Sequence, residues 1–73
     1  MPTVRFEGWE TGFQSIPFIR LLMAHTSWGL KEAKDATDQL RNGAPLYLVV
    51  PTAAGAQKLL TEGRALGAKG ELL

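Results

Sequence analysis

The sequence predicts an α+β domain of two layers, in which three helices cover one face of a three-stranded sheet. Apolar and polar residues alternate in residues 3–9, which is typical of a half-buried strand. Residues 46–50 are all apolar or aromatic, which is typical of a buried strand. Three further segments repeat apolar residues with helical spacing. The predicted element order is therefore β-α-α-β-α-β, a split β-α-β arrangement, and residues 1–73 form a single domain.

The first strand and the first helix are indicated by periodicity and by a proline. In the segment TVRFEGW, residues 3–9, Val4 and Phe6 lie on one side and Arg5 and Glu7 on the other, which predicts a half-buried strand. We also expect Trp9 to join the core. Pro17 is favoured in the first turn of a helix, where its missing N–H needs no partner. The helix is expected to continue to about His25.

The second helix and the second strand follow a short break, TSWG, in which the role of Trp28 stays open. Gly29 is expected to cap the helix, with Glu32 reaching back to the free backbone N–H as in a capping box. This helix should end near Arg41, before an Asn-Gly stop signal. The run LYLVV, residues 46–50, lies between two prolines and predicts a buried strand.

The third helix and the last strand complete the chain. Thr52 is the expected N-cap of a helix that continues to about Leu66, and Gly67 is its expected C-terminal stop. Gly63 lies on the inner face of this helix, where a close approach to the sheet would explain it. The final AKGELL predicts a short strand with Leu72 facing inward.

The connections determine the predicted topology of the sheet. The last two strands are joined through a helix, which predicts a parallel pair. The first strand fits most simply between them, antiparallel to both, so that it occupies the centre of the sheet. All three helices then lie on one face.

Composition excludes several classes of function. Eight basic and seven acidic residues give a net charge of +1, without the basic clustering typical of nucleic-acid binders. There is no cysteine, no signal-like or membrane-spanning run, and no glycine-rich phosphate motif. His25 is the single histidine and no carboxylates cluster by spacing. We therefore expect a cytoplasmic protein that is not an enzyme and needs no metal or cofactor, no nucleic acid and no membrane.

The first helix carries two apolar stripes. One has the members Phe18, Leu21, Leu22 and His25, and the other has the members Ile16, Ile19, Arg20 and Met23. They are about 200° apart around the axis, and a two-layer domain buries one such stripe against its sheet. Off the core stripe of the second helix lie Leu30, Lys31 and Lys34. Scattered exposed apolar residues are normal, but these together predict an apolar patch with a basic rim.

At this point the sequence resembles a known family. The segments GLKEAKD and GAPLYLVVPTAAGAQKLLTEGRALGA are similar to the C-terminal domain of the bacterial ribosomal stalk protein, which recruits translational GTPases. The resemblance covers essentially the whole chain and implies the same element order. It also implies that the outer face of the first two helices binds a protein partner. Combined with the second stripe, it gives these candidate partner-binding residues: Ile16, Pro17, Ile19, Arg20, Met23, Gly29, Leu30, Lys31, Glu32 and Lys34.

The departures from the family leave other partners open. Ser15 and Met23 stand where the family has basic residues, and Pro17 replaces a small one, so the surface is more apolar. The family's dimerisation domain and hinge have no counterpart here, and we expect a monomer with a pairing-prone edge at residues 46–50. One alternative is a stand-alone regulator, host- or phage-encoded, that binds RNA polymerase or another large machine. A weaker one is a protease adaptor of this fold, whose acidic pair is reduced here to Glu10.

Overall fold

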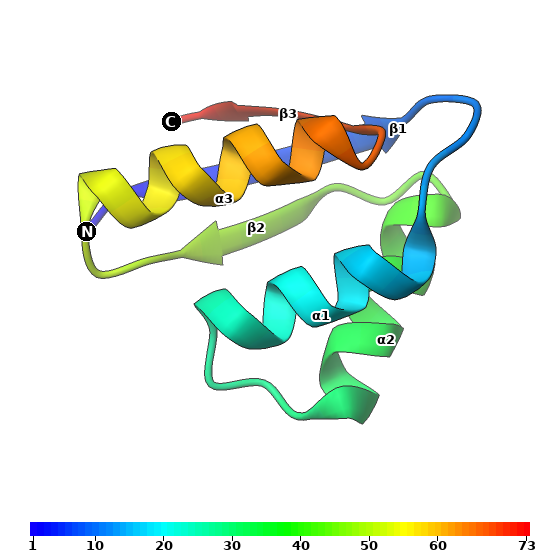
Figure 1. The fold of residues 1–73 in the computed structure, drawn as a ribbon, viewed down its shortest axis with the longest axis horizontal. Helices are drawn as coiled ribbons and strands as arrows, with labels where there is room; N and C mark the ends of the chain where they lie inside the picture. Colours follow the sequence, from blue (N-terminus) through cyan, green and yellow to red (C-terminus); the bar gives the residue numbers. More distant parts are fainter.

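The computed structural model describes residues 1–73 and has the predicted order of elements (Figure 1). Each element lies close to its predicted bounds. The elements are β1 (Thr3–Trp9), α1 (Ser15–His25), α2 (Leu30–Arg41), β2 (Leu46–Val49), α3 (Ala53–Ala65) and β3 (Ala68–Leu72). None of the three helices has the length and apolar character needed to cross a membrane.

The sheet has the order β2-β1-β3, with β1 antiparallel to both neighbours, which confirms the prediction of a central first strand. Val4 pairs with Leu48 on one side and with Leu72 on the other. The pairing of β1 with β3 shifts between Phe6 and Gly8, where β1 carries a bulge. Because alternate residues of a strand point to opposite faces, the register fixes which side chains the helices cover.

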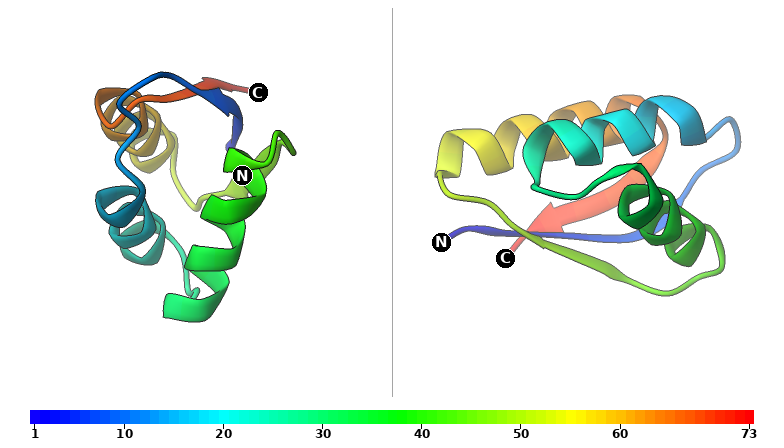
Figure 2. Two further views of the ribbon diagram at one scale, coloured as in Figure 1. Left: turned by 90° about the vertical axis from the view of Figure 1, so that its right-hand side faces the viewer. Right: turned by 90° about the horizontal axis from the view of Figure 1, so that it is seen from below.

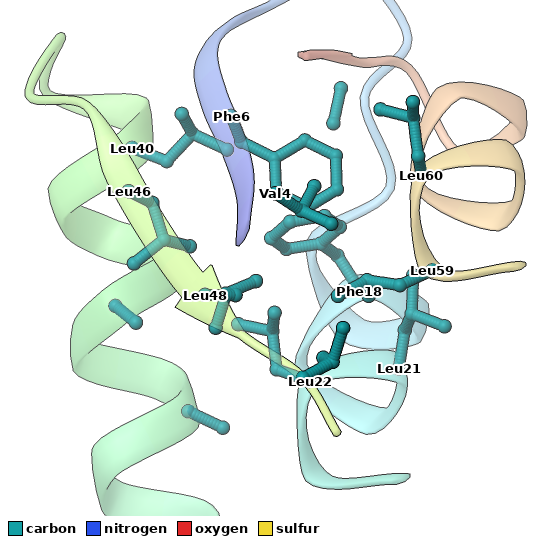
Figure 3. Packing of buried hydrophobic residues seen from close by; sticks show 14 of the residues in the cluster. Val4, Phe6, Phe18, Leu21, Leu22, Leu40, Leu46, Leu48, Leu59 and Leu60 are labelled. Carbon is teal, nitrogen blue, oxygen red and sulfur yellow. The ribbon is translucent and has the colours of Figure 1, made fainter. Parts of the chain in front are cut away.

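The helices cover one face of the sheet, as the alternating burial of β1 and β2 shows. In the right-hand view of Figure 2, α1 and α3 lie together above the strands, while α2 overlaps β1. Inward-facing residues of β1 and β2 are buried, while Tyr47 and Val49 on the opposite face are exposed. The core between the layers brings Phe6 and Phe18 edge to face, with ring centroids 5.2 Å apart (Figure 3). A Cβ at Gly63 would lie 2.6 Å from Cζ of Phe6, which confirms that a close approach explains this glycine.

The residues predicted at the helix ends, Thr52, Gly67 and Gly29, occupy those positions, but one predicted side-chain contact is absent. The Thr52 hydroxyl accepts the backbone N–H of Gly55 at 3.0 Å, and Gly67 follows α3 with a φ of 99°. Such a positive φ favours glycine, which makes Gly67 a helix stop. Gly29 is the N-cap of α2, but no side chain caps this end. The predicted capping box with Glu32 is therefore wrong.

Two further side chains are placed differently from the predictions. Trp9 is 42% exposed, because it is the last residue of β1 and lies at the rim of the helical layer. Its Nε1–H donates to the carbonyl of Arg41 at 3.1 Å, and the Arg41 guanidinium lies 5.9 Å from its ring centroid. Leu72 is also 42% exposed, at the end of an edge strand. Trp28, whose role was open, is partly buried against the core.

Candidate docking surface on the first two helices

Helix α1 divides around its axis into a buried arc and an exposed arc. The buried residues are Phe18, Ile19, Leu21 and Leu22. The exposed residues on the opposite side are Ile16, Pro17, Arg20, Met23 and Ala24. The exposed arc thus contains an apolar face with one cation near its middle, which is most of the predicted second stripe.

Ile19 is the exception, because its side chain is only 7% exposed while that of Ile16 is 63% exposed. The prediction that Ile19 belongs to an outer surface is therefore wrong. Around the helix axis Ile19 lies between Met23 and Leu22, at the border of the buried arc. Helix α1 packs against both α2 and α3. A helix with two helical neighbours in addition to a sheet buries a wider arc than a single core stripe.

Helix α2 lies across the direction of α1, as Figures 1 and 2 show. Nη1 of Arg41, at the end of α2, donates to the hydroxyl of Ser15 at the start of α1, at 3.3 Å. Leu30 and Lys34 share this side of the helix with Arg41 by helical spacing. We call these three residues the α1 flank of α2. Leu30 is 64% exposed, and Gly29, which precedes it, is exposed as well.

The remaining two candidates on α2 lie elsewhere around the helix. Lys31 is exposed on the outermost side of α2, away from both neighbours. Glu32 is exposed on the opposite side from Lys34, where it faces β2 together with Asp35 and Gln39. We call these three residues the β2 flank of α2. The structure therefore does not bring Glu32 together with the other candidates.

The three candidate cations Arg20, Lys31 and Lys34 form no salt bridge within the domain. The salt bridges of the structure join Arg5 to Glu7 and Glu71, and the ring of His25 lies beside the carboxylate of Glu62. Arg20, Lys31 and Lys34 take part in none of them. An unpaired cation beside an exposed apolar side chain is available to an acidic partner, because no internal salt bridge has to be broken first.

A groove beside α1 extends the exposed arc, and sequence analysis did not predict it. It lies between α1 and α3, has a volume of about 430 Å³, and is lined by Pro17, Leu21, Ala24 and Leu66, with charged residues at its rim. Leu66 reaches it as the residue that follows α3. The pairing of two helices far apart in sequence is a tertiary property, so helical periodicity alone could not locate it.

The exposed candidates of α1 and α2 form a surface with apolar and basic side chains that could contact a partner. We define the helix docking surface as Ile16, Pro17, Arg20, Met23, Gly29, Leu30, Lys31 and Lys34. His25 lies outside it, half-buried, with Nε2 3.4 Å from Oε2 of Glu62. Nowhere in the structure do three or more His, Cys, Asp or Glu side chains gather so that they could hold a metal ion.

Comparison with known proteins does not add to these observations. No protein-family model matches the sequence, and no match was found among curated proteins or solved structures. The likeness to the ribosomal stalk domain therefore depends on the segments quoted above and on the order of elements that they share.

Proposed function

We propose that this protein is a non-catalytic interaction module that docks its helix docking surface on a protein partner, a translational GTPase. The observation that carries the proposal is the exposure of Ile16 and Leu30 beside unpaired cations. Both side chains are almost two-thirds exposed and are not part of the buried core. In a complex they would supply most of the affinity, since a few buried anchors dominate binding energies.

The charges define the chemistry of the partner. Arg20, Lys31 and Lys34 surround the apolar anchors, and helical spacing places a single exposed carboxylate, Asp38, beside the two lysines, so the cations outnumber it. Such a rim favours a partner with an acidic patch around an apolar pocket. Its contribution is mainly to orientation and association rate, which depend on ionic strength.

The choice of a translational GTPase comes from the GLKEAKD segment, which includes Gly29, Leu30, Lys31 and Lys34. A second candidate function is that of a regulator of RNA polymerase or of another large machine. The observation that favours it is the apolar character of the surface, where Met23 and Pro17 replace the basic and small residues of the stalk family. Both candidates use the same surface and differ only in the partner.

A direct binding measurement tests the proposal. Fluorescently labelled protein is titrated with a purified elongation GTPase bound to a non-hydrolysable GTP analogue, and in parallel with RNA polymerase. Leu30→Glu should weaken binding to the partner by at least tenfold. Val49→Glu is the matched control, because Val49 is 59% exposed on the open face of the sheet and should leave affinity unchanged.

The outcomes separate the candidates. Binding of the GTPase that Leu30→Glu weakens and Val49→Glu does not supports the proposed function. If only RNA polymerase binds, and Leu30→Glu weakens that binding while Val49→Glu does not, the second candidate function is supported and the first is contradicted. Equal losses in both variants, or none in either, would show that this surface is not the docking site.

A further inference from the structure

A second concave surface lies on the other side of α2 from the helix docking surface. Between the β2 flank of α2 and strand β2 there is an open trough of about 440 Å³. Its lining includes Trp28, Glu32, Asp35, Gln39, Pro45 and Tyr47. The trough therefore has a helix as one wall and the outer edge of the sheet as the other.

The edge of the sheet at this trough carries free backbone groups. β2 is an edge strand, paired only with β1. Val50 donates its backbone N–H to the carbonyl of Pro2 at 3.0 Å, which places Val50 in a hydrogen-bonded pair. Because such pairs alternate along an antiparallel ladder, Leu48 also faces β1 with its backbone. The N–H and C=O groups of Tyr47 and Val49 then point away from the sheet.

The electrostatics of the trough are one-sided. Glu32 and Asp35 line it, neither forms an ion pair, and no basic residue lines it. Trp28 and Ala36 supply an apolar surface beside these carboxylates. A long basic side chain matches this combination, because its aliphatic stem can cover apolar atoms while its charged end reaches a carboxylate.

We propose that the trough binds an extended basic segment of a partner protein, which adds to the sheet as a fourth strand beside β2. Its backbone pairs with the free groups of Tyr47 and Val49, the usual basis of recognition by strand addition. Alternate side chains of the added strand point into the trough, and at these positions lysine or arginine meets Glu32 and Asp35. This site lies on the opposite flank of α2 and does not depend on the helix docking surface.

A second copy of the chain is the other possible occupant, and the charges oppose it. Two copies that paired through β2 would each bring their own Glu32 and Asp35 to the shared edge. Two acidic troughs would then lie on one extended sheet, without a cation on either β2 flank to compensate them. Like charges at a strand edge are a common device against self-pairing.

The binding test uses a nine-residue peptide of alternating threonine and lysine with blocked ends. Titration into the isotope-labelled protein should shift the amide signals of Tyr47 and Val49 and slow their hydrogen exchange. A peptide with glutamate in place of lysine should not bind. Failure of the lysine peptide to bind at millimolar concentration would overturn the proposal.

Two pairs of variants test the backbone and the charges separately. Val49→Pro removes an outward N–H from the β2 edge, a position where proline is tolerated in a sheet. Leu72→Pro does the same on the β3 edge and is its control, since the backbone of Leu73 pairs with Thr3 and that of Leu72 points outward. We expect Val49→Pro to weaken peptide binding at least tenfold and Leu72→Pro to leave it unchanged.

For the charges, the double variant Glu32→Lys, Asp35→Lys should abolish binding, whereas Asp38→Lys, outside the trough, should reduce it less than threefold. Equal effects of the trough and control variants would contradict the proposal. If Val49→Pro does not fold, two methylated peptides test the backbone pairing instead, one N-methylated at every lysine and the other at every threonine. Alternate residues of a strand direct their N–H groups to opposite sides, so only the peptide whose methyl groups point away from β2 should bind. Protection of Tyr47 and Val49 in a peptide-free dimer would assign the edge to a second copy and overturn the proposal.

Discussion

The two flanks of helix α2 belong to the same twelve residues and yet offer opposite chemistry. The α1 flank presents an exposed leucine with the cations Lys34 and Arg41, whereas the β2 flank presents the carboxylates of Glu32 and Asp35. Between the flanks runs one buried stripe of Ala33, Ala36, Thr37 and Leu40. A short amphipathic helix can thus separate two binding surfaces of unlike charge, because its core stripe occupies only part of its circumference.

The comparison also shows why a flank cannot be assigned from one helix alone. Ile16 and Ile19 have the same side chain and the same predicted stripe, and yet only Ile16 is exposed. The difference arises because α2 crosses α1 and covers one border of its outer face. Which border is covered depends on the packing of two helices, so the sequence pattern of one helix leaves it undetermined.

The largest expected effect comes from placing a charge in the core that both flanks share. Ile19→Glu should destabilise the domain by more than about 4 kcal/mol, because a buried unpaired carboxylate is expensive to desolvate. Total stabilities of about 5–15 kcal/mol are usual, so much of this variant should be unfolded at 37 °C. Thermal unfolding followed by circular dichroism measures the change. The matched control is Ile16→Glu, which should shift stability by less than about 0.5 kcal/mol.

The next largest effect is expected in the core on the side away from α2, where Gly63 of α3 packs against Phe6. Gly63→Ala should destabilise the domain by about 1–3 kcal/mol, because its Cβ would lie 2.6 Å from the Phe6 ring and something must shift. Chemical unfolding of the variant and of Gln57→Ala, on the exposed side of α3, provides the measurement. A stabilising effect of Gly63→Ala, as expected from helix propensity alone, would show that the ring can move freely.

Much of the fold and part of the candidate docking surface could be predicted from the sequence. Strand alternation, helical periodicity and the Thr52 and Gly67 signals were enough for every element and for the central position of β1. They were also enough for the exposed positions Ile16 and Leu30, because these lie far from the core stripes. What they could not provide depends on contacts between distant segments. Those features are the burial of Ile19, the groove that ends at Leu66 and the trough beside β2.

Trp9 illustrates the same limit at the end of a strand. Simple alternation places Trp9 on the same side of β1 as Arg5 and Glu7, but the bulge between Phe6 and Gly8 shifts that alternation, and strand periodicity does not reveal a bulge. We expected Trp9 in the core because it is a large aromatic residue, but its ring lies at the rim and contacts Arg41. Sequence reasoning therefore placed Trp9 in the correct strand but predicted its burial wrongly.

An intermediate effect is expected at the contact between Trp9, at the end of β1, and Arg41, at the end of α2. Trp9→Ala should destabilise the domain by about 1–2 kcal/mol, because it removes the hydrogen bond to the Arg41 carbonyl and the cation–π contact with the Arg41 guanidinium. Hydrogen exchange should show the loss most clearly in the last turn of α2. Trp9→Phe retains an aromatic ring without the N–H and should recover part of the stability. Equal losses in the two variants would show that the ring itself contributes little.

The smallest effect addresses the flanks themselves through two single charge reversals. Lys34→Glu and Glu32→Lys should each change stability by less than about 0.5 kcal/mol, since both side chains are exposed and unpaired. Their effects on binding should differ. Lys34→Glu should weaken binding of the acidic partner about threefold to tenfold at low salt, while Glu32→Lys should weaken only the lysine peptide. Raising the salt to about 0.5 M should remove most of both effects, because screening then acts over only a few ångströms. If each reversal weakened both ligands equally, the flanks would act as one electrostatic field, and the separation of two surfaces on α2 would be wrong.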